Sequence, residues 1–272
     1  MKSEVFNGSR FWTYFKYDLV QMWRNHMKAA IGIGFSGVIV YFLTAIFYLI
    51  FTGSWGGPTA PVRAITFFAA GAFLELYYTR IYGYLTDRRK GSAWLMLPAS
   101  SFEKWLSMMI MALIILPIVL AVVFLSVDWF MAVLDPTVGH SLLYYAHNGY
   151  SAISEALVEA NAEYQTLWTP ATFVPTLLVS FCFNYLFFLL CGLCFKKNKI
   201  INAFIVSIVI SIVWSVIMNL FGEPFSYNLS FEEFADAQVF IEHTLTIITI
   251  VFGIIALGIA GGIYYRIKTI KH

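Results

Sequence analysis

Apolar residues gather along the 272-residue chain into six long stretches, and the shorter segments between them hold most of the charges. Each stretch reaches the roughly 20 residues that a helix needs to cross the hydrocarbon layer of a bilayer. Backbone groups in lipid must pair within their own segment, and the alternation of a membrane barrel is absent, so these stretches are predicted helices. The predicted spans cover approximately Ala30–Phe51, Ala64–Tyr84, Leu106–Leu134, Phe173–Phe195, Ile200–Phe221 and Val239–Tyr265. The sequence therefore predicts an all-α integral membrane protein whose residues 1–272 form a single transmembrane domain.

The composition supports lipid as the solvent of this domain. Hydrophobic residues make up 60% of the chain and charged residues only 12%. A soluble protein carries about 25% charged residues. The three cysteines all fall in the fourth predicted span, so no disulfide framework is indicated.

A shorter amphipathic segment, residues 11–24, precedes the first span. Its apolar positions recur at three- and four-residue spacing (Phe11, Phe15, Leu19 and Met22), and its aromatic anchors are Trp12, Tyr14 and Trp23. This pattern is typical of an interfacial helix that lies in the headgroup plane. The alternative is that the same residues form an extension of the first span on the cytosolic side.

The distribution of charge predicts the orientation of the chain. Basic residues cluster before the first span, between the second and third, between the fourth and fifth, and after the sixth; only Arg63 falls on the opposite side. By the positive-inside rule, six spans with both termini in the cytoplasm fit this distribution. The opposite side carries ten acidic residues and a large external loop over residues 135–170, in which an amphipathic helix is predicted.

The polar segment between the second and third spans has an unusual order of residues. It begins with three cations, continues through a short apolar run, and ends at Pro98, after which Ser100 is placed to cap a new helix. We expect an amphipathic helix here that receives a push from a soluble partner. The residues assigned to this coupling site are Arg88, Arg89, Lys90, Trp94, Leu95, Leu97 and Pro98.

Sequence motifs of catalysis are missing from the chain. It holds no G-x-x-x-x-G-K-[ST] loop, no H-E-x-x-H motif and no spaced Cys/His ligand set, so neither a catalytic site, a metal site nor a bound cofactor is expected. Some polar residues nevertheless fall within the spans, where they are predicted either to line a translocation path or to join helices. These residues are Glu75, Asn184, Ser207, Ser211, Ser215 and Asn219.

The order of these parts, together with the string LMLPASSFEKWLS at Leu95–Ser107, resembles the membrane subunits of bacterial type-two ATP-binding-cassette exporters. The long loop between the third and fourth spans departs from the pattern of that family. The resemblance implies an elbow helix at Phe11–Trp23, a coupling helix within Asp87–Ser101, and a location in the bacterial cytoplasmic membrane. It also implies a second permease subunit, and a separate ATPase subunit that binds ATP and Mg²⁺.

The function expected from this resemblance is that of a permease subunit that is not itself an enzyme. It would form the path for a lipid, a drug or an apolar peptide, with no role for nucleic acid. Two other classes remain open: an intramembrane enzyme that uses Glu75 or the pair His140 and His147, and a membrane receptor or immunity protein that transports nothing.

Overall fold

The computed structural model is helical throughout the residues that it describes, with no strand among them. These residues are 6–86, 91, 94, 96–146, 148, 170–221 and 231–270, with the backbone alone given at 170–174, 214, 217–221 and 231–242. The chain divides into two compact units, one formed by Met1–Leu74 and Phe102–Tyr164, the other by Glu75–Ser101 and Gln165–His272. We call them unit 1 and unit 2.

Unit 1 begins with a helix that starts before the first span and runs into it without a loop. Helix α1 (Gly8–Met22) passes into a π-helical turn, η1 (Trp23–Met27), and then into α2 (Lys28–Gly34). After a single turn residue, Phe35, the chain continues as α3 (Ser36–Thr52). The amphipathic segment predicted at 11–24 is thus helical but continuous with the first span, which favours the extension over a separate interfacial helix.

A second series of helices in unit 1 follows the polar segment. Helix α6 (Ser101–Ile110) starts where Ser100 was expected to cap it, and it continues through a second π-helical turn, η3 (Met111–Ile115). Helix α7 (Leu116–Leu134) follows, and a short 3₁₀ turn, η4 (Pro136–Val138), ends the series. The widened turn directly precedes Pro117, whose missing N–H and ring disfavour a regular α-helix at this point.

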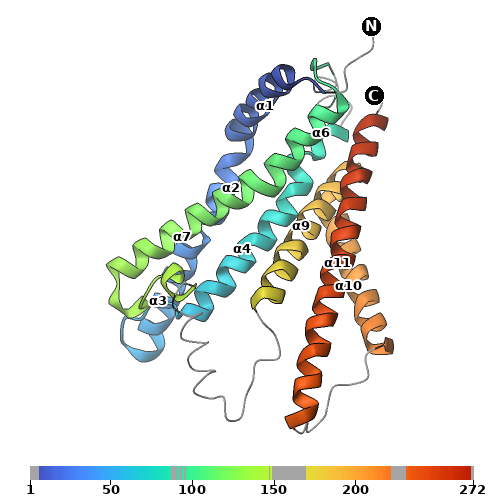
Figure 1. Ribbon diagram of the computed structural model, residues 1–272. Coiled ribbons are helices and arrows are strands. Elements are labelled where there is room, and N and C mark those ends of the chain that lie inside the picture. Colours follow the sequence, from blue (N-terminus) through green and yellow to red (C-terminus); the bar gives the residue numbers. More distant parts are fainter. Residues whose placement is uncertain are drawn as a thin grey trace. The chain divides into compact units, whose positions relative to one another are not determined.

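The two series of unit 1 lie side by side and run in the same direction (Figure 1). A Cβ atom added to Gly34 would lie 2.7 Å from a methyl group of Val123, so glycine permits the close approach of α2 and α7. One turn later, Gly37 faces the ring of Phe124. Gly34 and Gly37 therefore serve helix packing, whereas a Cβ atom on Gly32 would meet nothing within 4 Å.

Unit 2 holds the remaining helices. Helix α4 (Ala60–Ile81) begins in unit 1 and ends here, where the 3₁₀ turn η2 (Gly83–Thr86) follows it. The other members are α9 (Pro170–Cys194), α10 (Lys199–Phe221) and α11 (Phe231–Thr269).

Helices α9 and α11 run parallel to each other within unit 2. The hydroxyls of Thr176 and Thr249 lie 2.6 Å apart, and the rings of Phe183 and Phe252 lie 5.3 Å apart. The end of α4 packs against α9 so closely that a Cβ atom on Gly192 would lie 2.8 Å from the backbone of Thr79.

Five helical segments of the described chain are long and apolar enough to cross a membrane. They are Gly8–Thr52, Ala60–Thr86, Ser101–Leu134, Pro175–Cys194 and His243–Thr269. These correspond to five of the six predicted spans and indicate a multi-pass membrane protein. The fifth predicted span falls on α10, whose shorter apolar part is Lys199–Val213. The helix predicted within loop 135–170 lies outside the described residues.

Candidate coupling site

A buried carboxylate joins α1 to α6 at one end of unit 1. Glu103 is fully buried, at 0% exposure. Its carboxylate accepts hydrogen bonds from Nε and Nη2 of Arg10, both at 2.8 Å, and from the backbone N–H of Asn7 at 2.8 Å. A buried charge is tolerated only with such partners, so Glu103 requires α1 to remain beside it.

A second buried contact joins the same two helices farther along. The hydroxyl of Ser107 donates a hydrogen bond of 2.6 Å to the carboxylate of Asp18, and both side chains are buried. At the start of the pair, the rings of Phe6 and Phe102 meet edge to face with centroids 6.0 Å apart. Helices α1 and α6 are therefore held at three levels, and we call them together the head.

The opposite side of α1 is exposed. Trp12 and Trp23 are both exposed, and the ammonium group of Lys16 lies 5.3 Å above the ring of Trp12. Phe11, Phe15 and Leu19, which were assigned to the interfacial helix with them, are half-buried. Tyr14 is buried, so it does not serve as the exposed anchor that the pattern predicted.

In unit 2, a lysine anchors the residues that lead into the polar segment. The Lys199 ammonium group donates hydrogen bonds to the carbonyl of Gly83 and the hydroxyl of Thr86, and it lies 3.3 Å from the carbonyl of Gly192. Nearby on α9, the carbonyl of Leu193 accepts a bond of 3.3 Å from Nε of Arg266 on α11. The beginning of the polar segment is thus tied through Lys199 to α10 and α9, and α9 is bonded in turn to α11.

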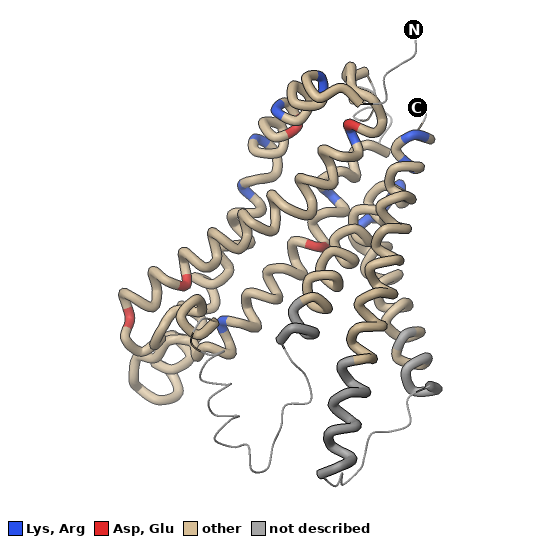
Figure 2. The backbone as a smooth tube through the Cα atoms, viewed as in Figure 1, with Lys and Arg blue, Asp and Glu red and all other residues tan. Residues whose placement is uncertain are grey.

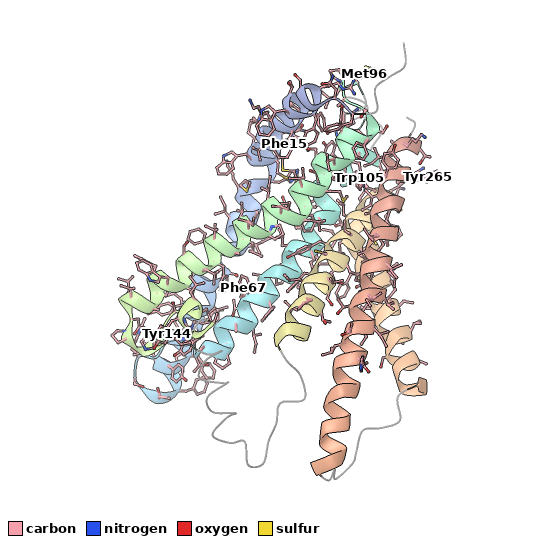
Figure 3. The ribbon with its side chains drawn as sticks, viewed as in Figure 1. Phe15, Phe67, Met96, Trp105, Tyr144 and Tyr265 are labelled. Carbon is pink, nitrogen blue, oxygen red and sulfur yellow. The ribbon has the colours of Figure 1, made fainter. Side chains whose placement is uncertain are left out.

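In the described part of the polar segment, one large apolar side chain is buried and another is exposed to solvent. Trp94 is only 5% exposed, so its side chain is buried within the protein. Met96 is 85% exposed and lies at the tip of the segment that leads into α6 (Figure 3). Leu97 is half-buried and Pro98 is exposed, whereas Arg88, Arg89, Lys90 and Leu95 lie outside the described residues.

At the opposite end of unit 1, Arg63 forms a buried ion pair. Its Nη1 lies 2.7 Å from Oδ1 of Asp128, and its Nη2 donates to the carbonyls of Val138 and His140 at 3.2 and 2.8 Å. The other carboxylate oxygen of Asp128 accepts from the backbone of Leu142 at 2.6 Å. The one cation that breaks the charge pattern is therefore neutralised inside the protein.

A second aspartate, Asp135, is bonded to residues from several elements at this end of unit 1. The carboxylate of Asp135 accepts from the phenol of Tyr41 at 2.6 Å and from the indole of Trp55 at 3.0 Å. Both the backbone N–H and the hydroxyl of Thr137 donate to its other oxygen, and that hydroxyl accepts from the backbone of Gly57. Asp135 thus ties α3, the loop after it and η4 together.

This network fixes the ionisation of Asp135. Burial favours the neutral acid and alone raises the pKa, but the hydrogen bonds from Tyr41, Thr137 and Trp55 favour the carboxylate. Their combined effect lowers the pKa of Asp135 to about 2.

Charge therefore has a polarity along unit 1. Among the described residues, five cations against two carboxylates lie in the head, η1 and the start of α2, whereas two carboxylates against one cation lie at the far end (Figure 2). The first set is Arg10, Lys16, Arg24, Lys28 and Lys104 with Asp18 and Glu103; the second is Asp128 and Asp135 with Arg63. We call these the basic end and the acidic end.

The polar residues assigned to a path or to helix contacts are spread over different environments. Glu75 is buried in unit 2, one turn before Tyr78, whose ring lies 5.2 Å from that of Tyr185 on α9. Asn184 is half-buried on α9, and the side chain of Asn219 is outside the described residues. The members of this set therefore lie on three helices, α4, α9 and α10.

The serine stripe of α10 makes bonds within its own helix. The hydroxyl of Ser207 donates to the carbonyl of Phe204, and that of Ser211 to the carbonyl of Ser207. Ser211 and Ser215 are exposed. Ser207 and Ser211 thus use their hydroxyl protons within α10.

Groups of three or more His, Cys, Asp or Glu side chains placed to hold a metal ion do not occur among the residues that the structure describes. His140 is exposed and its ring stacks on Tyr144 at 4.0 Å, whereas His147 lies outside the described residues.

Comparison with protein-family models, curated proteins and solved structures finds no match to this chain.

The residues that organise both ends of unit 1 carried only weak signals in the sequence. Asp135 precedes Pro136 and Thr137, an arrangement typical of an aspartate that caps a turn. Glu103 has the spacing of a capping box, but its carboxylate reaches Arg10 and Asn7 of another helix. The residue spacing around Glu103 does not predict partners that lie so far away in the sequence.

The Asp135 network makes stability depend on pH in a narrow acidic window. Because the folded-state pKa is about 2 and the ordinary value is 3.8, this contribution is complete above pH 4 and is lost as the pH falls from about 4 to about 2. We expect the thermal midpoint of the wild type to fall more steeply over this window than that of Asp135→Asn. Equal slopes for the two proteins would contradict the assignment.

Proposed function

We propose that this chain is the permease subunit of an ATP-driven exporter, and that a separate ATPase drives it through the polar segment between α4 and α6. The observation that supports this most directly is the anchoring of that segment. Its beginning is bonded to unit 2 through Lys199, and the helix at its end is bonded to α1 in unit 1 through Glu103 and Ser107.

A force on the segment would reach both units through these anchors. Motion of η2 would be passed to α9 through Lys199, since the lysine bonds to both elements. Motion of α6 would be passed to α1, because separating them would leave the carboxylate of Glu103 buried without partners. A soluble motor could therefore act on both units from one contact.

Met96 is the apolar side chain best placed for that contact. A large apolar side chain that is 85% exposed in a polar segment, rather than in a span, is suited to a pocket on another protein. Methionine is also adaptable in shape, which favours docking in a groove. In this proposal Met96 takes the role that the sequence assigned to Trp94, while Trp94 stabilises the segment from inside.

The remaining features of the proposal follow from charge and from the missing motifs. The basic end of unit 1 would face the cytoplasm of a bacterial cell, where the ATPase and its ATP and Mg²⁺ lie. The chain would supply six spans, α10 included, and would pair with a second permease subunit. The substrate class is a lipid, a drug or an apolar peptide.

The test is association with the ATPase and stimulation of its turnover. We expect Met96→Asp to reduce co-purification with a P-loop ATPase, and to lower stimulated ATP hydrolysis in nanodiscs, by at least about tenfold, because a charge in an apolar pocket costs more than about 1.4 kcal/mol. Met96→Leu should retain both. If the purified chain binds no ATPase, or Met96→Asp binds it as well as Met96→Leu does, the proposal fails.

A further inference from the structure

We propose that the acidic end of unit 1 holds one internal water molecule, bound to Nε of Arg63. The two terminal nitrogens of this guanidinium group donate three hydrogen bonds, to Asp128, Val138 and His140. The Arg63 side chain is 5% exposed, and its Nε has no acceptor among the described residues. Buried donors of this kind are nearly always paired, with protein or with ordered water.

A cavity of matching size lies beside this group. It offers about 20 Å³ to a water-sized molecule and is lined by Arg63 and Thr66 of α4 and mainly by apolar residues of α3 and α7. A cavity needs about 10–15 Å³ on this measure to hold one water. The space therefore suits a single water and is too small for a larger ligand.

The polar residues in the wall supply the other partners. Asp128, Tyr41 and Thr66 line the same cavity, and each has an oxygen that accepts hydrogen bonds. The hydroxyls of Tyr41 and Thr66 already donate, to Asp135 and to the carbonyl of Val62, so their lone pairs remain for a donor. A water that accepts from Nε and donates to Asp128 and Thr66 has the three bonds usual for buried water.

A high-resolution structure of the full chain in nanodiscs tests this site. We expect ordered density within about 2.7–3.2 Å of Nε of Arg63. A map that resolves other buried waters but leaves this position empty would overturn the proposal.

A matched pair of variants tests the role of Thr66. Thr66→Val removes an acceptor from the cavity, whereas Thr44→Val removes the same kind of hydroxyl-to-carbonyl bond on α3, away from it. We expect the thermal midpoint to fall further for Thr66→Val. A fall no larger than that of Thr44→Val would contradict the proposed bonding.

A different observation carries a second inference, which deepens the proposed coupling role. We infer that the head rocks on the rest of unit 1 about a hinge formed by the two π-helical turns. Such turns carry wider, less regular hydrogen bonding than an α-helix, and they often mark functional sites. In unit 1 one of them follows each helix of the head, η1 after α1 and η3 after α6.

The two helix series are aligned so that η1 and η3 lie beside each other, at the same position along the helix axes. Asp18 lies 89 residues from its partner Ser107, and Gly34 has the same separation from Val123 on the other side of the turns. The midpoints of η1 and η3, Asn25 and Leu113, follow this spacing to within one residue. Two soft turns at the same height in parallel helices allow bending there while the head stays intact.

Distances between spin labels in the full chain test the hinge. The measurement needs no ATPase, so a negative result would reject the hinge without rejecting the proposed function. Labels are placed at Thr13 and Leu43, across the turns, and at Thr13 and Leu106, within the head, with the three native cysteines replaced. We expect a broader distribution for the pair across the turns. Equal breadth for the two pairs would overturn the inference.

Shortening the turns provides a second readout. Deleting Asn25 and Ile114 removes one residue from each π-helical turn, which restores a regular helix while keeping the flanking faces in register. We expect this to narrow the distribution across the turns, whereas Asn25→Ala with Ile114→Ala should leave it broad. An unchanged breadth after the deletions would also overturn the hinge.

Discussion

The structure of unit 1 depends on the burial of one carboxylate. Glu103 has no exposed surface, and it accepts hydrogen bonds from Arg10 and Asn7 at the start of α1. A charge in such a place is far more costly alone than paired, so the helix that follows the polar segment and the helix that opens the chain are stable only together. Asp18 and Ser107 repeat this dependence two turns farther along α1. Helices α1 and α6 each extend a predicted span, and these bonds join the two extensions into one rigid unit.

The same physical rule explains the other end of unit 1. Arg63 and Asp128 are both buried, and Asp135 collects four donors at the end of α7. Each buried charge has an oppositely charged or hydrogen-bonding partner, which offsets the cost of removing it from water. Several cations of the basic end are exposed to solvent, whereas the charged side chains of the acidic end are buried and bonded to other residues of the protein. This difference gives the unit a polarity that agrees with the positive-inside rule and accounts for its single exception.

The sequence predicted the helical class and the location of most spans, because apolar length is a local property. It also predicted the start of α6 from Ser100. It did not predict that α1 continues into the first span, since an amphipathic pattern fits both arrangements, nor that Trp94 turns inward while Met96 is exposed. The partners of Glu103, Asp135 and Arg63 come from residues 65 to 96 positions away, or from short turns. Periodicity carries no information about such pairs.

The most direct test of this account is a double-mutant cycle on Arg10 and Glu103, measured as the free energy of unfolding of the full chain in bicelles. Arg10 is 37% exposed and can return to water, so we expect a coupling energy of about 1–2 kcal/mol, below that of a fully buried pair. Arg10→Gln, Glu103→Gln and the double variant would then differ clearly from additivity. Additive effects, within about 0.5 kcal/mol, would mean that the two helices are not held together by this bond, and the head would not be one body.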